Sequence, residues 1–355
     1  MNHSLRSALV SSLVVSAVAG AAPASAQVAE PQMAYAVGVG PIQNDVITAT
    51  LDGTVMQRFV DVEPWSSIDH GVVTVTRHVN SFRSNVVGYD AATGDRLFKV
   101  FDARLPLLTP HGRGLVFAPD NLGSLRPDER DPFVQSLWYR EFATSDEFKL
   151  AQFYRADFGI LEKAVSPQGD RVAFTRGNNT FLFEWNIWIV NTDGTGLMQL
   201  TGDDMSNYPS FRPDGQMLAI SKLYEGPCHG ALATLSLDGK DERVFYESTC
   251  AMDLTRPVWI GPHRVVTVWW RHDAQGNRTV GLVVVNVETG ELDPIFEGTV
   301  GDVSVSRKLG HVAFRAGAAH GKIGLYAIET GRLRFLSTTD PLARVELAGT
   351  AEDAV

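Results

Sequence analysis

The stretch VNVETGE, residues 285–291, is an apolar strand that runs directly into a tight turn at Gly290. Glycine suits this turn because it accepts a positive φ without a Cβ clash. Closely similar phrases recur along the chain as TLDGT, YDAATGD, VNTDGTG, LSLDGKD and AIETGR. The turn glycines are Gly53, Gly94, Gly194, Gly239, Gly290 and Gly331, at intervals of 41, 100, 45, 51 and 41 residues. Such a period indicates a protein built from repeats.

The interval of 100 residues holds two repeats with one turn disguised, meaning that this turn has no glycine. We place the turn at Ser145 and Asp146, which lie near the midpoint of the interval. A second signal runs in phase with the seven turns. A Pro-x-Gly turn leads a strand in SPQGDRVAFTR, residues 166–176, and in RPDGQMLAISK, residues 212–222. Each repeat predicts four antiparallel strands, A to D, and such units form propeller blades. We predict an all-β propeller with seven blades, and six blades is the alternative.

The two ends of the chain predict how the ring closes. The first repeat has room for strands B, C and D but little room for strand A. Residues 343–347 follow the last repeat, and we expect them to supply this innermost strand of the first blade. The alternative is an unstructured tail, which we expect for residues 350–355. One propeller domain then spans residues 27–349.

The first 26 residues are typical of a cleaved signal peptide. Arg6 supplies a cation, an apolar stretch follows, and Ala24 to Ala26 forms an Ala-x-Ala site, so we expect cleavage before Gln27. No later apolar run reaches the ~18 residues of a membrane span. The sequence therefore predicts an exported protein, periplasmic or secreted. The net charge of −10 argues against nucleic-acid binding, which needs cations to neutralise phosphates.

Two repeats carry a family resemblance. The phrases SPQGDRVAF and IWIVNTDGTGLMQLT, within residues 166–201, resemble the TolB-type propeller repeat, and the match is fair over residues 212–246 and weaker elsewhere. At Gln168 the usual Asp of that repeat is missing. The resemblance implies a propeller fold. It leaves function open, because such propellers serve as periplasmic scaffolds, as accessory domains of peptidases and occasionally as lyases.

In a propeller the B–C loops and the D–A connections share one rim, where binding sites gather. Cations recur at the ends of the B strands, namely Arg77, Arg176, Lys222, Arg271 and Arg315. Carboxylates recur at the starts of the A strands, namely Asp157, Asp204, Asp253 and Asp302. One interpretation is a charged mouth that binds a peptide or a sugar acid, with Arg holding carboxylates. The other is a set of structural ion pairs between blades, which repetition in every blade favours.

Histidines also fall near that rim, namely His78, His229, His272 and His320. Four imidazoles on one rim can hold Mn or Zn. However, His70, His111, His263 and His311 fall near the opposite rim, which is what scattered surface histidines give. We therefore predict no cofactor, and a divalent metal on the His-bearing rim is the less favoured alternative.

Two long B–C insertions break the repeat. Residues 120–142 of the third blade include Arg130, Trp138 and Tyr139, and residues 177–186 of the fourth include Phe181, Phe183 and Trp185. Aromatic side chains and Arg on loops are typical of protein-binding surfaces. The alternative for residues 181–185 is a C strand that starts early. Together with Arg77, His78, Arg176, His229, Arg271, His272 and His320, these residues form the predicted binding rim.

Cys228 and Cys250 are the only cysteines, and the predicted topology places both on this same rim. A disulfide between them suits an oxidising compartment, and two free buried thiols are the alternative.

The first functional hypothesis is a scaffold that binds an envelope or secreted protein partner through this rim. The second is an enzyme, a polysaccharide or sugar-acid lyase or hydrolase, with its site at the channel mouth. The sequence identifies no catalytic residue, partner or oligomeric state.

Overall fold

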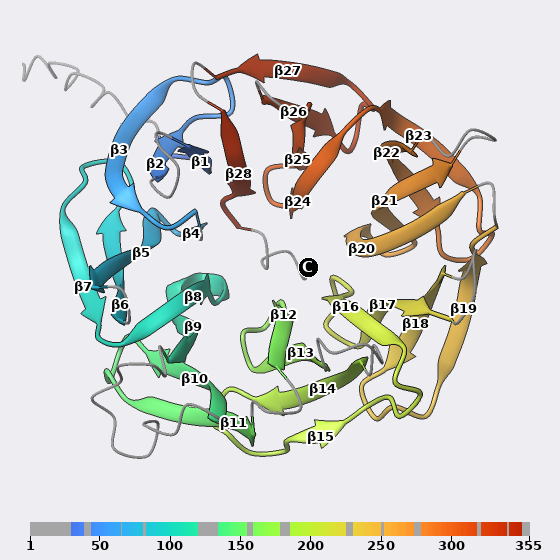
Figure 1. Ribbon diagram of the computed structural model, residues 1–355, viewed down its shortest axis with the longest axis horizontal. Helices are drawn as coiled ribbons and strands as arrows, with labels where there is room; N and C mark the ends of the chain where they lie inside the picture. The colour runs from blue at the N-terminus through green and yellow to red at the C-terminus, as the bar shows by residue number, and fades with distance from the viewer. Residues whose placement is uncertain are drawn as a thin grey trace, which may run out of the picture.

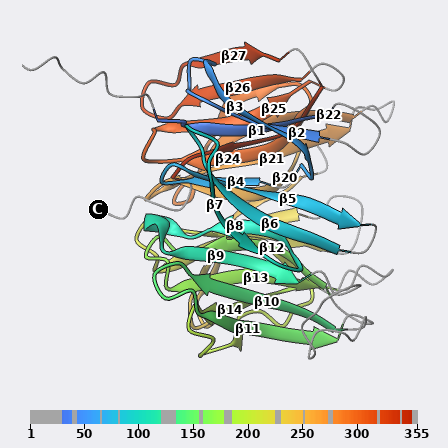
Figure 2. The same ribbon diagram turned by 90° about the vertical axis from the view of Figure 1, so that its left-hand side faces the viewer.

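The structure is a computed structural model that describes residues 30–38, 44–64, 66–80, 83–119, 134–154, 159–177, 185–224, 230–249, 252–272, 278–317, 321–338 and 341–349. Within these ranges the strands form seven antiparallel sheets of four strands each. Figure 1 shows the sheets arranged radially around a central axis, and Figure 2 shows the same ring from the side. The predicted seven-bladed propeller is therefore confirmed, and six blades is excluded.

The first four blades, each given from its innermost to its outermost strand, are as follows. They comprise β28 (Leu342–Leu347), β1 (Met33–Gly38), β2 (Asn44–Ala49) and β3 (Val55–Val62); β4 (Ser66–Asp69), β5 (Val72–Asn80), β6 (Arg83–Asp90) and β7 (Arg96–Val100); β8 (Ala103–Leu108), β9 (Gly114–Pro119), β10 (Val134–Glu141) and β11 (Glu147–Tyr154); and β12 (Gly159–Val165), β13 (Arg171–Gly177), β14 (Trp185–Asn191) and β15 (Met198–Gln199). A short 3-10 turn, η1 (Pro110–Gly112), joins β8 to β9.

The last three blades follow the same order. They comprise β16 (Ser206–Phe211), β17 (Met217–Leu223), β18 (Gly230–Ser236) and β19 (Glu242–Glu247); β20 (Asp253–Gly261), β21 (Arg264–His272), β22 (Arg278–Asn286) and β23 (Leu292–Glu297); and β24 (Val300–Ser306), β25 (His311–Ala316), β26 (Lys322–Ala327) and β27 (Leu333–Ser337). We call the rim reached by the ends of the B strands and the starts of the C strands the loop face, and the opposite rim the turn face.

The ring is closed by the C-terminal strand, as predicted. Strand β28 pairs antiparallel with β1, with Leu347 opposite Met33 and Val345 opposite Tyr35. It begins one residue before the predicted segment. Beyond it, the amide of Gly349 donates to Asp69 Oδ1 of the second blade at 2.9 Å. The two ends of the propeller are therefore joined in one sheet.

The disguised turn of the third blade lies where it was predicted. The amide of Glu141 donates to the carbonyl of Asp146 at 2.9 Å, and Ser145 takes a φ of 63°. Ser145 thus adopts the left-handed conformation that glycine supplies in the other repeats.

The hydrophobic core lies between neighbouring blades. In the cluster between the fourth and fifth blades, Ile187, Leu218 and Ile220 are fully buried. Burial of each such side chain contributes about 1.5–3 kcal/mol. The strands are apolar on both faces because each sheet is covered on both sides, as at Val283 and Val284 of β22.

The bounds of the two long insertions require a correction. Strand β10 begins at Val134 and β14 begins at Trp185, so Trp138, Tyr139 and Trp185 lie in strands and not in loops. An early start of the C strand was considered for residues 181–185. In the structure this strand, β14, begins at Trp185, the last residue of that segment. No helix among the described residues has the length and apolar character needed to cross a membrane.

Candidate functional site

Six of the seven innermost strands carry an irregularity of register that shapes the central channel. In β16, Asn207 pairs with Ser221 but Ser210 pairs with Ala219, so residues 208 and 209 oppose a single residue. Corresponding irregularities interrupt β8, β12, β20, β24 and β28. A β-bulge of this kind bends the strand and redirects its side chains. Here the bulges lie on the strands that face the axis.

Three of the bulges share an x-Pro pair. The residues before proline are Leu105, Tyr208 and Arg256, and their φ values are 53°, 52° and 56°. Proline has no N–H to donate, so it is tolerated on an edge strand or in a bulge. Positive φ is uncommon for residues with a side chain. The repeated strain is a local feature of the channel wall.

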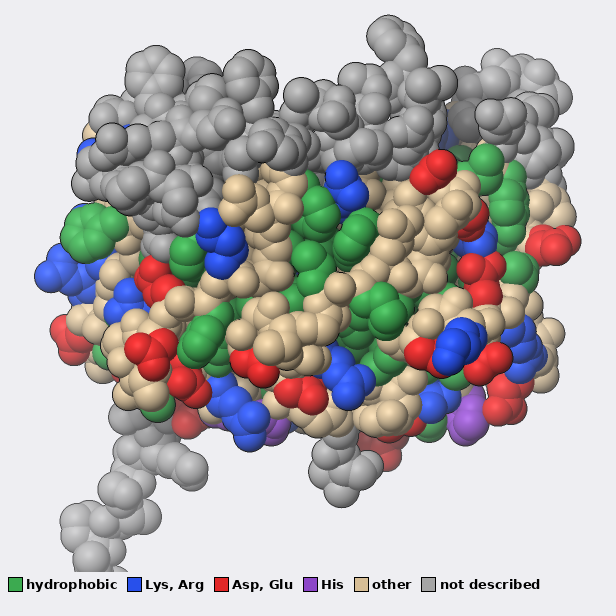
Figure 3. Space-filling view, turned by 90° about the horizontal axis from the view of Figure 1, so that it is seen from below, with side chains coloured by type: hydrophobic (Ala, Val, Ile, Leu, Met, Phe, Trp, Pro, Cys, Tyr) green, Lys and Arg blue, Asp and Glu red, His purple; other side chains and the backbone are tan. Residues whose placement is uncertain are grey.

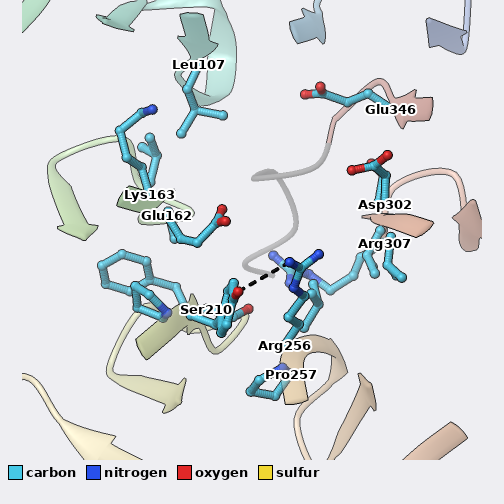
Figure 4. Close-up of a pocket in the computed structure, with 18 of the residues that line it drawn as sticks. Leu107, Glu162, Lys163, Ser210, Arg256, Pro257, Asp302, Arg307 and Glu346 are labelled. Atoms are coloured by element: carbon cyan, nitrogen blue, oxygen red, sulfur yellow. Dashed lines mark hydrogen bonds between the residues drawn. The ribbon is translucent and has the colours of Figure 1, made fainter. Parts of the chain in front are cut away.

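The bulged strands enclose a cavity of about 370 Å³ on the axis, and charged side chains from several blades line it. The cations are Lys163, Arg256, Arg307 and Arg344, and the carboxylates are Glu162, Asp302 and Glu346. Figure 4 shows Glu162 pointing toward the centre from one side and Asp302 and Glu346 from the other. The channel is thus a polar, water-accessible site within a β core.

Adjacent bulges contact each other. Arg256 of β20 donates from Nη2 to the hydroxyl of Tyr208 of β16 at 3.2 Å, the dashed contact in Figure 4. The guanidinium also lies 4.8 Å from the centroid of the Tyr208 ring. The channel wall is therefore linked between the fifth and sixth blades.

Two channel residues have strongly displaced pKa values. Burial lowers the pKa of Lys163 to about 8; Glu162 opposes this, and Arg344 and Arg104 add to it. Burial raises the pKa of Glu346 to about 7, while Arg344 and a hydrogen bond from Ser67 act in the opposite direction. Both groups therefore change charge near neutral pH.

Several of the repeated rim cations are engaged within their own blade or its connection. Lys222 pairs with Asp203 at 2.6 Å and also with Glu242. Arg315 lies 3.9 Å from Asp302 of the neighbouring strand. These ion pairs lie within a blade or its connection and not between blades.

Arg77 and Arg176 lie against aromatic rings. Arg77 donates from Nε to the hydroxyl of Tyr89 at 3.1 Å. Arg176 lies 4.2 Å from the ring centroid of Phe153 in the third blade and 5.4 Å from that of Trp188 in its own blade. Arg176 is therefore a contact between blades.

The aromatic residues predicted for the third-blade loop pack inside that blade. Tyr139 is buried in the core and stacks on Phe148, so it cannot contribute to a binding rim, a correction to the prediction. Trp138 donates from Nε1 to Ser136 Oγ at 3.0 Å, and Lys149 lies over its ring.

Trp185 opens β14 at the loop face. It is partly buried, and its amide donates to the carbonyl of Asp204 at 2.8 Å. His78 is exposed, and its Nε2 lies 3.3 Å from Glu63 Oε1.

The other predicted rim residues fall outside the described residues: Arg130, Phe181, Phe183, His229 and His320, as do both cysteines. His272 ends β21, and only its backbone is described. Among the described residues, no group of three or more His, Cys, Asp or Glu side chains is placed to hold a metal.

The sixth blade presents a patch at the loop face that sequence reasoning identified only in part. Arg271 lies 5.3 Å from the ring centroid of Trp269 and pairs with Glu297. Arg278 lies 5.1 Å from the ring centroid of Trp270. We call Trp270, Arg271 and Arg278 the blade-six patch, because Trp269 is only 4% exposed and packs in the core between the fifth and sixth blades. The phrase WWRH could have revealed it, because alternation puts its two Trp side chains on opposite faces of β21.

The outer wall of the ring is different. Figure 3, a view from the side, shows Lys and Arg side chains interspersed with Asp and Glu, without a large area of one sign.

No family model matches the chain. A curated relative, the Tol-Pal system protein TolB of Gluconobacter oxydans (strain 621H), is 34% identical over 100 residues, which is 26% of this chain and 20% of the relative. The chain thus matches about a fifth of that relative's length. The resemblance predicted from the repeats is confirmed: the protein is a seven-bladed β-propeller that is similar to TolB over this stretch.

Solved structures share the fold over most of the chain. The β-propeller domain of the Trilobed protease from Pyrococcus furiosus, described as having an open velcro topology, superimposes with a TM-score of 0.61 at 13% identity, covering 88% of this chain and 95% of that one. An oligogalacturonate lyase in complex with manganese gives 0.59 at 12% identity, covering 88% and 87%. At these identities the likeness establishes the propeller fold alone.

Proposed function

We propose that this protein is an exported propeller that binds a protein partner through its loop face. The observation that carries the proposal is the blade-six patch, where Trp270 and Arg278 stack at a rim of a ring that is otherwise tightly packed. Trp and Arg are enriched among the residues that dominate binding energy at protein interfaces. They combine large apolar area with directional hydrogen bonding at one place.

Two further observations support a protein partner. Strands β9 and β13 end at the loop face, and the long loops of the third and fourth blades are predicted to follow them. The curated relative is named as a component of the Tol-Pal system, and a multi-component system requires contacts between proteins. The likeness to that relative covers too little of it to identify the partner.

The test is co-purification from an envelope extract with the tagged protein, followed by mass spectrometry and by titration of the purified partner. Replacing Trp270 with Ala or Arg278 with Glu is expected to weaken binding at least about tenfold. Arg264→Glu is the matched control, because Arg264 is exposed at the turn face of the same strand. Equal loss in the control, or full binding by Trp270→Ala, would contradict the proposal.

The third-blade loop provides a second variant. Because β10 begins at Val134, a deletion limited to residues 121–132 leaves the strand intact. Loss of the partner in this variant places the loop in the interface, whereas retained binding confines the interface to the blade-six patch.

Export is part of the proposal. The protein purified from the periplasm or the medium is expected to begin at Gln27, as read by N-terminal sequencing. A chain that retains residues 1–26 and stays in the cytoplasm would contradict it.

A second candidate is an enzyme that acts on a polysaccharide or sugar acid in the channel. It is favoured by the pKa values of Lys163, about 8, and Glu346, about 7, because functional sites often hold groups that titrate near neutrality. The test follows the ultraviolet absorbance of unsaturated products and the appearance of reducing ends from uronic-acid polymers. Activity that is lost in Glu346→Gln would favour the enzyme, and no turnover by the purified protein would count against it.

A further inference from the structure

The wall of the channel beside β12 carries a cation that the rest of the ring does not neutralise. Lys163 lines the cavity and makes no ion pair or hydrogen bond with any other residue that the structure describes. The contrast with Lys222 is direct, since that lysine is held by Asp203 and Glu242. Within the described ranges, Glu162 is the one carboxylate that favours the charged form of this partly buried ammonium group, so a bound anion would stabilise it further.

Two arginines reinforce this positive charge. Arg344 of β28 and Arg104 of β8 both disfavour the protonated form of Lys163, so both lie within electrostatic range of its amine. In the described part of the chain, Nε of Arg104 is buried and has no hydrogen-bond partner. A buried donor without an acceptor carries a desolvation cost, which a ligand oxygen would offset. Figure 4 shows Lys163 on the side of the cavity next to Leu107, which β8 also supplies.

The same bulges place these groups. Arg104 immediately precedes the irregularity of β8, and Lys163 immediately follows that of β12. The two strands are the innermost strands of adjacent blades, so this part of the cavity wall lies between the third and fourth blades. It is separate from the blade-six patch.

We propose that Lys163, Arg104 and Arg344 form a binding site for a carboxylate group inside the channel. Arg receives carboxylates in bidentate geometry, and charge-assisted hydrogen bonds are the stronger kind. Glu162, Asp302 and Glu346 lie on the same cavity, so they disfavour a dianion such as phosphate more than a single carboxylate. The cavity of about 370 Å³ falls in the range of small-molecule sites.

The carboxylate belongs either to a free organic acid or to the end of a peptide, and the experiment separates these sources. Isothermal titration at pH 7 uses glucuronate against glucose, and acetyl-trialanine with a free C-terminus against its C-terminal amide. If the site binds free organic acids, glucuronate is expected to bind at least roughly tenfold more tightly than glucose. If the site binds peptide ends, acetyl-trialanine with a free C-terminus is expected to bind at least roughly tenfold more tightly than its amide. Equal binding of acid and neutral forms, or no heat from either acid at millimolar concentration, would overturn the proposal.

Variants identify the site. Lys163→Met is expected to weaken binding of the accepted acid roughly tenfold, while Lys163→Arg retains it and Lys240→Met, an exposed control, leaves it unchanged. With wild-type protein, affinity is expected to fall as the pH rises above about 8, because the amine loses its proton. With Lys163→Arg that fall should disappear, because guanidinium stays charged.

Melting temperatures establish that each variant is folded before it is titrated. Wild-type affinity in Lys163→Met, or the same pH dependence in Lys163→Arg, would refute the assignment of the site. Either failure would leave the protein partner at the loop face untouched, because the blade-six variants test that separately.

Discussion

Arg256 lies over the ring of Tyr208 and hydrogen-bonds its hydroxyl, and both residues precede a proline in equivalent bulges of adjacent blades. This contact joins two innermost strands at the channel wall. In these two bulges each strand turns a side chain toward the channel, where the two side chains meet. The polar channel is therefore a consequence of repeated backbone irregularity.

The first prediction concerns that contact. In a double-mutant cycle of Arg256→Ala and Tyr208→Ala, we expect a coupling of about 0.5–1 kcal/mol in the free energy of unfolding, the range for exposed cation–π pairs. Urea denaturation of the four proteins measures it. As a control, Arg256→Ala combined with Tyr326→Phe should be additive, and a coupling indistinguishable from zero for the first pair would contradict the contact.

The second prediction concerns ring closure. Leu347 is fully buried in β28, so Leu347→Ala is expected to cost about 2–5 kcal/mol in the free energy of unfolding. Phe335→Ala in the outermost strand β27 is the control, because Phe335 is 42% exposed and should cost much less. If thermal melting showed equal losses, β28 would not be an integral strand of the ring.

The third prediction concerns pH. Glu346 is 7% exposed, and its pKa rises from 4.5 to about 7 on folding, mainly through burial and with further contributions from Asp69 and Asp302. The folded state therefore holds this proton more tightly than the unfolded state. The resulting stabilisation is complete below about pH 4.5 and is lost as the pH rises through 7.

Glu346→Gln tests this sign. The variant should be more stable than wild type at pH 8, by on the order of 3 kcal/mol, and the difference should shrink toward pH 4.5. Denaturation at several pH values measures the difference in stability between the variant and wild type. The contributions of the other titrating groups cancel in this difference. A variant that is less stable than wild type at pH 8 would show that the ionised carboxylate is compensated in the native state.

The sequence predicted the ring well because its signals are local. The Gly turns and the strands that follow the Pro-x-Gly turns set the period, and the missing A strand of the first repeat predicted the role of residues 343–347. Even Ser145 was located by spacing alone. Strand limits at the long loops were placed poorly, since charged and aromatic residues such as Arg140 and Trp138 also occur in strands.

The channel was missed because it depends on bulges, which shift side chains from one face of a strand to another. Strict alternation cannot show that Lys163 and Arg344 lie on one cavity. One signal was present: Pro106, Pro209 and Pro257 occur within innermost strands, where proline indicates an edge or a bulge. The displaced pKa values arise mainly from burial between strands of different blades, so they required the structure.

The fourth prediction concerns the two cysteines. Both lie outside the described residues, so the disulfide between them remains a prediction. The described residues that flank them are paired: the amide of Ser248 donates to the carbonyl of Gly230 at 2.8 Å. Cys228 precedes Gly230 by two positions, and Cys250 follows Ser248 by two positions. Protein from the periplasm or the medium should therefore resist alkylation unless it is first reduced, as mass spectrometry would show.

Reduction of that disulfide should lower the free energy of unfolding by roughly 3 kcal/mol, from the entropy of the loop it closes. The double variant Cys228→Ser, Cys250→Ser should match the reduced protein. Ready alkylation of both cysteines in the untreated exported protein would show that they are free thiols.

Photo-crosslinking in intact cells tests most directly the central claim that the loop face binds a protein partner. A photoreactive phenylalanine analogue is placed at position 270, at the loop face, or at position 264, at the turn face of the same strand. We predict one abundant adduct of defined mass from position 270 and none from position 264. Equal adducts from both positions, or an adduct from position 264 alone, would contradict the claim.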